Sequence, residues 1–86
     1  MGKFEKLVMK LLSGASDNNF GFEELRLILL NLGFTEKMAA GSHRIFYKEN
    51  ISEIVNIQPL GSKAKPYQVK QVRAIILKYK LFSYEQ

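Results

Sequence analysis

The chain has 86 residues, 47% of them apolar, and no cysteine. This length predicts one domain with a modest core, and the lack of cysteine excludes disulfides, thiolate catalysis and cysteine-bound zinc. The first residues mix lysines with apolar side chains, and no apolar run approaches the ~20 residues of a membrane span. We therefore expect no signal peptide and predict a cytoplasmic protein.

The net charge of +5 is unevenly distributed along the chain. Residues 1–36 carry four basic and five acidic side chains, whereas residues 37–86 carry nine basic and three acidic ones. Between Pro59 and Leu81 there are six basic residues and no acidic residue. This asymmetry favours a polyanion or an acidic protein as the partner of the C-terminal half.

Two amphipathic helices are predicted before residue 34. The first spans residues 3–13 and has an apolar stripe made of Phe4, Leu7, Val8, Leu11 and Leu12. A polar turn at residues 16–19 follows it. The second helix begins near Gly21, places two glutamates in its first turn and ends at Gly33. Its apolar stripe consists of Phe22, Leu25, Ile28, Leu29 and Leu32.

Three strands are predicted next, of which residues 34–40 form the most weakly patterned. In residues 42–48, alternation places His43, Ile45 and Tyr47 on one face. The other face then carries Ser42, Arg44, Phe46 and Lys48. Glu49-Asn50 forms a turn, and residues 51–58 are rich in isoleucine. The last two strands are expected to form a hairpin.

A basic loop at residues 59–65 and a final helix complete the pattern. Pro66 begins this helix, because its fixed φ and missing N–H suit the first turn. Its apolar stripe consists of Val69, Val72, Ile75, Ile76 and Tyr79. The order of elements predicts a single α+β domain with its helices on one face of a small antiparallel sheet.

His43 is the only histidine and the main candidate for chemistry. Imidazole exchanges a proton near neutral pH, Gly41 permits close approach of backbone or phosphate, and Ser42 offers a hydroxyl. Without further context, an idle histidine at a strand end is the commoner interpretation. A metal site with Glu49 and Glu53 is less favoured, because one histidine lacks the usual cluster of ligands. The sequence contains no glycine-framed serine elbow, so it does not predict a serine-hydrolase triad.

A second candidate is the basic group on the loop and the last helix. It consists of Lys63, Lys65, Lys70 and Arg73, which would hold phosphates together with the helix N-terminus at Pro66. Tyr47 and Tyr67 are candidates for stacking on bases. The alternative is a solvated basic face, with each tyrosine half in the core.

Three segments together resemble the HicA family of bacterial toxins. They are FEELRLILLNLGF at residues 22–34, GSHRIF at residues 41–46 and NIQPLGSKAKPYQVKQVRAIILKY at residues 56–79. The resemblance covers about residues 21–80 and leaves residues 1–18 as an extra N-terminal helix and turn. It implies a fold like that of double-stranded-RNA-binding domains, in the order α-β-β-β-α, with residues 34–40 as the first strand.

The resemblance also implies a ribonuclease toxin, an mRNA interferase, that degrades mRNA and is held inactive by a HicB-like antitoxin. The family's functional histidine corresponds to His43, and this chain has Arg44 where many members have a second histidine. We expect RNA contacts from Ser42, Arg44, Lys48, Lys63, Lys65, Lys70 and Arg73. No metal or cofactor is expected, because the 2′-hydroxyl of RNA can itself be the nucleophile. One histidine cannot be acid and base at once, so water or a lysine is expected to make the second proton transfer.

Two other functions fit the same pattern. One is a non-catalytic RNA-binding domain of the same fold, and the other is a structural domain whose basic face docks an acidic protein. RNA cleavage that survives a chelator and disappears without His43 would distinguish the toxin from both.

Overall fold

The computed structural model describes residues 2–41 and 43–82. Its elements in chain order are α1 (Lys3–Ser13), the 3-10 helix η1 (Asp17–Asn19), α2 (Phe22–Asn31), β1 (Thr35–Met38), β2 (Arg44–Tyr47), β3 (Val55–Ile57), β4 (Pro59–Leu60), β5 (Lys63–Ala64) and α3 (Pro66–Tyr79). Strands β1, β2 and β3 form one antiparallel sheet in that order, and β4 pairs with β5. The order α2-β1-β2-β3-α3 confirms the predicted α+β arrangement, with α1 as the additional helix.

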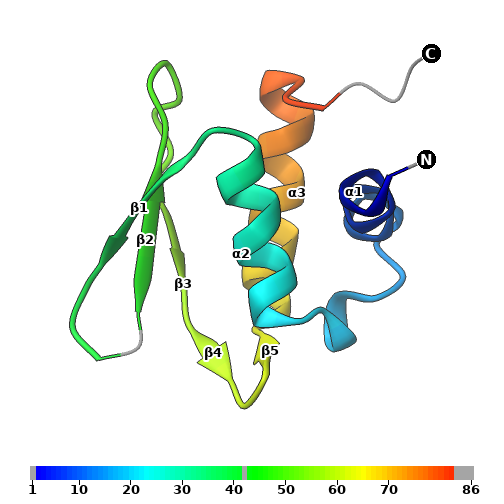
Figure 1. Cartoon of the computed structure of the whole chain (residues 1–86), viewed down its shortest axis with the longest axis horizontal. Coiled ribbons are helices and arrows are strands. Elements are labelled where there is room, and N and C mark those ends of the chain that lie inside the picture. Colours follow the sequence, from blue (N-terminus) through cyan, green and yellow to red (C-terminus); the bar gives the residue numbers. More distant parts are fainter. Residues whose placement is uncertain (1, 42, 83–86) are drawn as a thin grey trace.

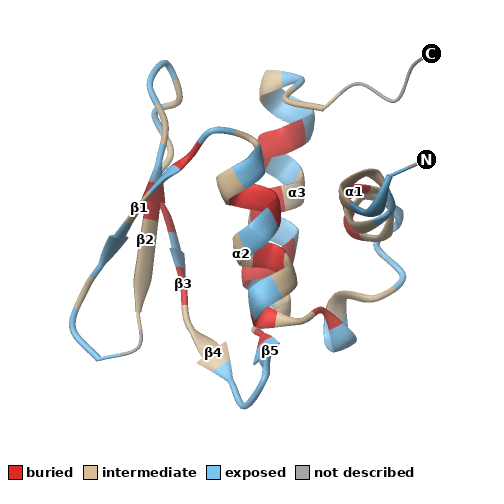
Figure 2. Cartoon of the chain, viewed as in Figure 1, coloured by how far each residue is buried: buried red, intermediate tan, exposed pale blue. Residues whose placement is uncertain are grey.

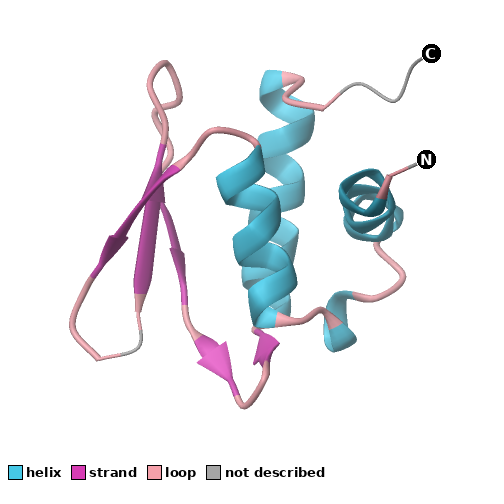
Figure 3. Ribbon diagram, in the orientation of Figure 1, coloured by secondary structure: helices cyan, strands magenta, loops and turns pink. Residues whose placement is uncertain are grey.

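The elements stack in three layers (Figure 1, Figure 3). Helices α2 and α3 form a layer between the three-stranded sheet and α1. Buried side chains lie between these layers (Figure 2), in one cluster that runs from Val8 in α1 to Ile76 in α3 and includes Phe46 of β2. The sheet therefore covers the helices with one face only. Within the part of the chain that the structure describes, no helix has the length and apolar character needed to cross a membrane.

Helix α2 begins and ends where its sequence predicts. The Glu24 carboxylate accepts a hydrogen bond from the Gly21 N–H (3.1 Å), which satisfies one of the N–H groups that a helix start leaves unpaired. Gly33 has φ +96° just after the last turn, a conformation that favours glycine. These local signals fix the helix against the core, with Leu25, Ile28 and Leu29 fully buried.

The third strand is shorter than predicted. Only Val55–Ile57 pairs with β2, whereas residues 51–54 leave the sheet. The turn at Glu49-Asn50 forms as predicted, closed by the Ile51 N–H on the Lys48 carbonyl. Beyond it, the Glu53 carboxylate binds Lys78 Nζ (2.8 Å) and the Tyr79 hydroxyl (2.6 Å) on α3. This long-range tether draws residues 51–54 towards α3 and shortens the strand.

The basic loop at residues 59–65 is more ordered than predicted. It contains the two-stranded ribbon β4–β5, with Gly61 at φ +66° in its turn. The ribbon is tied to the start of α2, because the Phe22 N–H donates to the Ser62 carbonyl and the Ala64 N–H donates to the Phe20 carbonyl. Backbone pairing with a distant segment therefore organises what local sequence indicates only as a loop.

Arg73 fastens the additional helix α1 to the rest of the fold. Its guanidinium donates to the Leu11 carbonyl in the last turn of α1 (3.1 Å) and forms two parallel hydrogen bonds with Asp17 (2.8 and 3.0 Å). The Asp17 and Arg73 side chains are only 12% and 19% exposed. Hydrogen bonding to Arg73 holds the pKa of Asp17 below its usual value. Helix α1 is thus part of the folded unit.

Candidate functional site

The turn between β1 and β2 brings His43 to the start of β2. The His43 carbonyl accepts the Ala39 N–H (3.1 Å), and the His43 N–H donates to the Ala40 carbonyl (3.4 Å). Gly41 lies in this turn with φ +68°, a left-handed conformation that costs other residues free energy. An added Cβ at Gly41 would meet no atom within 4 Å. The turn therefore needs glycine for its backbone conformation. The expected close approach of another backbone segment to Gly41 is not seen among the described residues.

Strand pairing places the His43 imidazole on the sheet face that points away from the helices. Arg44 pairs with Ile57 and Phe46 with Val55, and this set packs towards α2 and α3. Ile45, which pairs with Lys37 and Asn56, faces the other way. His43 shares that side by strict alternation. Among the described residues, no helix or other strand covers this face in Figure 1.

A neighbouring strand holds the imidazole. His43 Nδ1 lies 3.3 Å from Asn56 Oδ1, within hydrogen-bond distance. Asn56 is an exposed residue between the buried Val55 and Ile57 in β3, so strand geometry alone directs its side chain to the open face. The contact uses Nδ1, and no hydrogen bond joins Nε2 to another of the described residues.

A second group of polar side chains, Gln58, Lys65 and Gln68, links the C-terminal end of β3 to the start of α3. The side-chain oxygen Oε1 of Gln58 accepts a hydrogen bond from Lys65 Nζ (2.8 Å). The backbone N–H of Gln58 donates to Gln68 Oε1 (3.2 Å). Gln68 is 2% exposed, which fixes its amide in place. Arg44 pairs with Ile57, the last residue of β3. Gln58, which follows β3, therefore lies opposite His43, which precedes β2. The turn before β2 and the β4–β5 ribbon accordingly occupy the same end of the sheet (lower in Figure 1).

Lys63 and Lys65 lie close to this end, as the sequence suggests. Lys63 is exposed in β5, and Lys65 is the N-cap residue of α3. The first turn of α3 contains Pro66 and no acidic residue, so its helix dipole adds positive potential there. Lys70 is exposed one turn further along α3. These three lysines form the basic end of the molecule, a name kept below for Lys63, Lys65 and Lys70.

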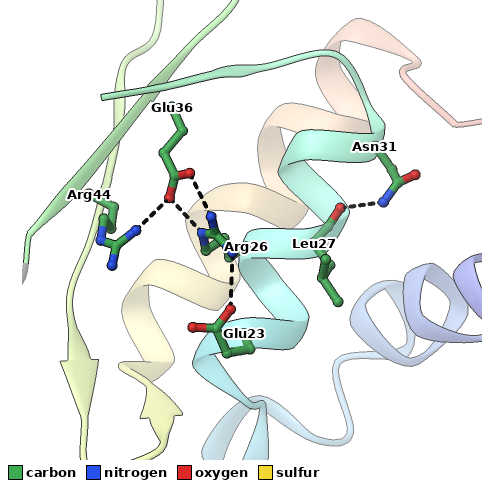
Figure 4. A network of polar contacts seen from close by, with 6 residues as sticks. All are labelled: Glu23, Arg26, Leu27, Asn31, Glu36 and Arg44. Carbon is green, nitrogen blue, oxygen red and sulfur yellow. Dashed lines mark hydrogen bonds and ion pairs between the residues drawn. The ribbon is translucent and has the colours of Figure 1, made fainter. Parts of the chain in front are cut away.

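The other predicted RNA contacts are placed elsewhere. Arg44 points to the helical side of the sheet, where it binds Glu36 (3.0 Å), which also forms two hydrogen bonds with Arg26 (2.6 and 2.9 Å; Figure 4). The bond from Arg26, supported by Arg44, holds the pKa of Glu36 below its usual value. Arg44 thus has a carboxylate partner on the face opposite to His43.

Lys48 and Arg73 also lie apart from the imidazole. A Cβ added at Gly33 would be 2.9 Å from Lys48 Nζ, which places this ammonium at the C-terminal end of α2, where the helix dipole favours a cation. Arg73 binds Asp17 and Leu11, as described above. Ser42 lies outside the described residues. Lys65 is linked to the histidine's end of the sheet through Gln58, whereas Lys63 pairs with Gly21 at the start of α2 and Lys70 lies on α3.

Asn56 and Gln58 were not predicted from the sequence. A signal for Asn56 exists, because it is the polar residue between two isoleucine- or valine-type positions whose alternation sends it to the histidine's face. Only strand register, which depends on long-range pairing, shows that it meets His43. Among residues 2–41 and 43–82, no group of three or more His, Asp or Glu side chains is arranged to hold a metal ion.

Comparison with known proteins identifies the family to which the chain belongs. No curated protein and no solved structure matches the chain. A family model described as HicA toxin of bacterial toxin-antitoxin matches residues 22–79, about two thirds of the chain. The match begins at the first residue of α2, ends at the last residue of α3 and includes His43, Asn56 and the basic end. The chain belongs to the HicA family of bacterial toxins.

Proposed function

We propose that this toxin is a metal-independent ribonuclease that cleaves mRNA, with His43 as the general acid–base group. The observation that carries the proposal is the placement of His43 on the open sheet face, with Nδ1 bound to Asn56 and Nε2 without a hydrogen bond to the described residues. A positioned imidazole of this kind accepts and returns protons at neutral pH. The family match supports a toxin, and the site supports RNA as its target.

The reaction uses the 2′-hydroxyl of the RNA as nucleophile. His43 Nε2 takes the proton of that hydroxyl, its oxygen bonds to the adjacent phosphorus, and the bond from phosphorus to the 5′ oxygen of the next nucleotide breaks. The leaving oxygen takes up a proton, for which water and Lys65 are the candidates. The products are a 2′,3′-cyclic phosphate and a 5′-hydroxyl. No step requires a protein nucleophile or a metal ion.

The basic end supplies positive charge near the phosphate. Lys65 is held by the Gln58 side chain at 2.8 Å, so its ammonium is oriented before RNA binds. Preorganised charge of this kind stabilises the additional negative charge of the transition state. Lys63 and the N-terminus of α3 extend the same positive region along the RNA backbone. Arg44 is assigned to the scaffold, because Glu36 already neutralises it.

Inhibition by a HicB-like antitoxin follows from the same geometry. His43 lies on a sheet face that no other described element covers, and Lys65 binds Gln58 at the same end of the sheet, so an acidic protein that covers this face would exclude RNA and be attracted at a steered rate. In a complex of the two proteins, His43 should lose its exposure to solvent. A complex in which the imidazole remains open, while cleavage is inhibited, would contradict this part of the proposal.

The test is cleavage of end-labelled single-stranded RNA by the purified protein in the presence of EDTA. We expect cleavage in EDTA with 2′,3′-cyclic phosphate ends, which identify the 2′-hydroxyl as the nucleophile. Cleavage that requires added Mg²⁺, or that leaves 5′-phosphate ends, would contradict the mechanism. Salt-sensitive RNA binding without cleavage would instead support the non-catalytic RNA-binding domain.

A further inference from the structure

The contact between His43 and Asn56 has a chemical consequence for the imidazole. In a neutral imidazole one ring nitrogen carries a proton and the other accepts one. The Asn56 atom that faces Nδ1 at 3.3 Å is the amide oxygen, which only accepts hydrogen bonds. Nδ1 must then carry the proton, and Nε2 must carry the lone pair. The amide thus selects the form of the imidazole whose basic nitrogen faces outward.

The position of Asn56 is fixed by the strand rather than by its own side-chain contacts. Val55 and Ile57 on either side are fully buried against the helices. Asn56 pairs with Ile45, which is two residues from His43 on the same strand face. A shift of the asparagine backbone would require β3 to leave the core. The side chain is therefore presented to the histidine by a rigid element, and its contact with Nδ1 orients the amide.

Among the described residues of β1, β2 and β3, no carboxylate shares this face with the imidazole. Lys37 of β1 lies beside Ile45, and Lys65 lies at the N-cap of α3. Glu36, the acidic residue of β1, is turned to the helical side, where Arg26 and Arg44 bind it. Asn56 consequently orients His43 without adding negative charge. A carboxylate in its place would stabilise the imidazolium and retain the proton that the reaction must pass on.

We propose that Asn56 is a positioning residue that accepts the His43 Nδ1 proton and so keeps Nε2 as the base that faces RNA. The tautomer is a property of the folded protein and does not depend on activity. Its catalytic effect rests on the proposed ribonuclease function. The two parts are therefore tested by separate measurements.

The tautomer is measured by NMR of the imidazole nitrogens in the full chain labelled with ¹⁵N-histidine. Because His43 is the only histidine, both ring signals belong to one residue. Above the titration range we expect a protonated Nδ1 and an unprotonated Nε2 in the wild type. Asn56→Ala should lose this preference, whereas Asn56→Asp, whose carboxylate also accepts a hydrogen bond from Nδ1, should keep it. A protonated Nε2 in the wild type, or an unchanged tautomer in Asn56→Ala, would overturn the assignment.

Catalysis provides the second readout. Asn56→Ala should lower kcat about tenfold, as expected for the loss of one orienting hydrogen bond, with little change in KM or in melting temperature. Asn56→Asp should move the acidic limb of the pH–rate profile upward, because a carboxylate stabilises the imidazolium. Asn31→Ala is the matched control, because Asn31 donates only to the Leu27 carbonyl within exposed α2 surface. An unchanged rate and profile in both Asn56 variants would overturn the positioning role. If the tautomer is as expected but the wild type cleaves no RNA, the ribonuclease proposal fails and the tautomer assignment stands.

Discussion

Three residues around His43 set its position by different physical means. Gly41 gives the preceding turn its left-handed backbone, Arg44 anchors the next residue of the strand to Glu36, and Asn56 holds the ring from the adjacent strand. Each acts on a different degree of freedom: the path of the chain, the register of β2 and the orientation of the imidazole. Together they leave the histidine exposed on one side and fixed on the other.

Replacement of Gly41 tests the first of these. Gly41→Ala should lower the free energy of unfolding by about 1 kcal/mol, because a left-handed backbone disfavours Cβ even though the space around it is open. Gly41→Asn should lose less, since asparagine tolerates this conformation. Chemical denaturation of the three proteins measures the difference. Equal stability of Gly41→Ala and wild type would show that this φ value is not required.

At the level of elements, boundaries that depend on local signals were predictable. Glycine after a helix, proline before one and apolar periodicity place α1, α2 and α3 close to their observed limits. The start of β3 and the ribbon β4–β5 were not, because Glu53 contacts α3 and Ser62 contacts Phe22 across long stretches of chain. Local sequence carries no signal for such contacts.

The candidate site divides in the same way. His43 and its neighbouring lysines were identified from residue type and from the motif that contains them. Asn56 depends on strand register, and the partners of Arg44 and Arg73 are carboxylates that lie on other elements. A basic residue in a sequence predicts positive charge but does not show whether that charge is already neutralised. This is why two of the predicted RNA contacts belong to the scaffold.

Arg73 and Lys70 provide a matched pair on α3. Arg73→Met should lower the free energy of unfolding by about 2 kcal/mol, because it leaves the shielded Asp17 carboxylate and the end of α1 without a partner. Lys70→Met, on the exposed side of the same helix, should change stability little. Urea denaturation of both variants measures this. If Arg73→Met is as stable as Lys70→Met, Arg73 is free to serve RNA after all.

Acid should weaken the contacts that join the elements. Asp17, Glu36 and Glu53 have lowered pKa values, chiefly through hydrogen bonds to Arg73, Arg26 and Lys78. Since the folded pKa lies below the unfolded one, their stabilisation is complete above about pH 4.5 and is lost as the pH falls. For Glu53 the loss extends to about pH 2, the value to which Lys78 and Tyr79 lower its pKa.

The matched variants for this pH dependence are Glu53→Gln and Glu49→Gln. Glu53→Gln should flatten the decrease of unfolding free energy between about pH 4.5 and pH 2, because it has no proton to bind. Glu49→Gln, in the exposed turn nearby, should keep the wild-type slope. The measurement is denaturation at a series of pH values. A slope unchanged by Glu53→Gln would contradict the tether to α3.

For the whole molecule, the proposed function depends on one open sheet face and one basic end. Helices α2 and α3 bury the other face of the sheet in a core that continues to α1, so the open face remains for partners (Figure 2). Glu36, Asp17 and Glu53 neutralise Arg44, Arg73 and Lys78 within the fold. The net positive charge that remains is concentrated on lysines such as those of the basic end.

The salt dependence of RNA affinity should therefore be modest, because only a few lysines contact phosphates. If Lys63, Lys65 and Lys70 meet phosphates, log affinity for single-stranded RNA should fall against log salt with a slope of roughly −2. Replacing all three with Gln should bring the slope near zero. Lys78→Gln, at the other end of α3 where Glu53 already binds it, should leave the slope unchanged. Binding by the triple variant with the wild-type slope would place the RNA on another surface.

The central claim is that His43 performs the proton transfer while the lysines bind RNA, and one paired measurement tests it most directly. The single-turnover cleavage rate, RNA affinity and melting temperature are compared for the wild type, His43→Ala and His43→Gln. Both variants should cleave about 10²–10⁴-fold more slowly, as is usual for the loss of a positioned acid–base group, with RNA affinity and melting temperature nearly unchanged. Cleavage at the wild-type rate by His43→Ala would contradict the account.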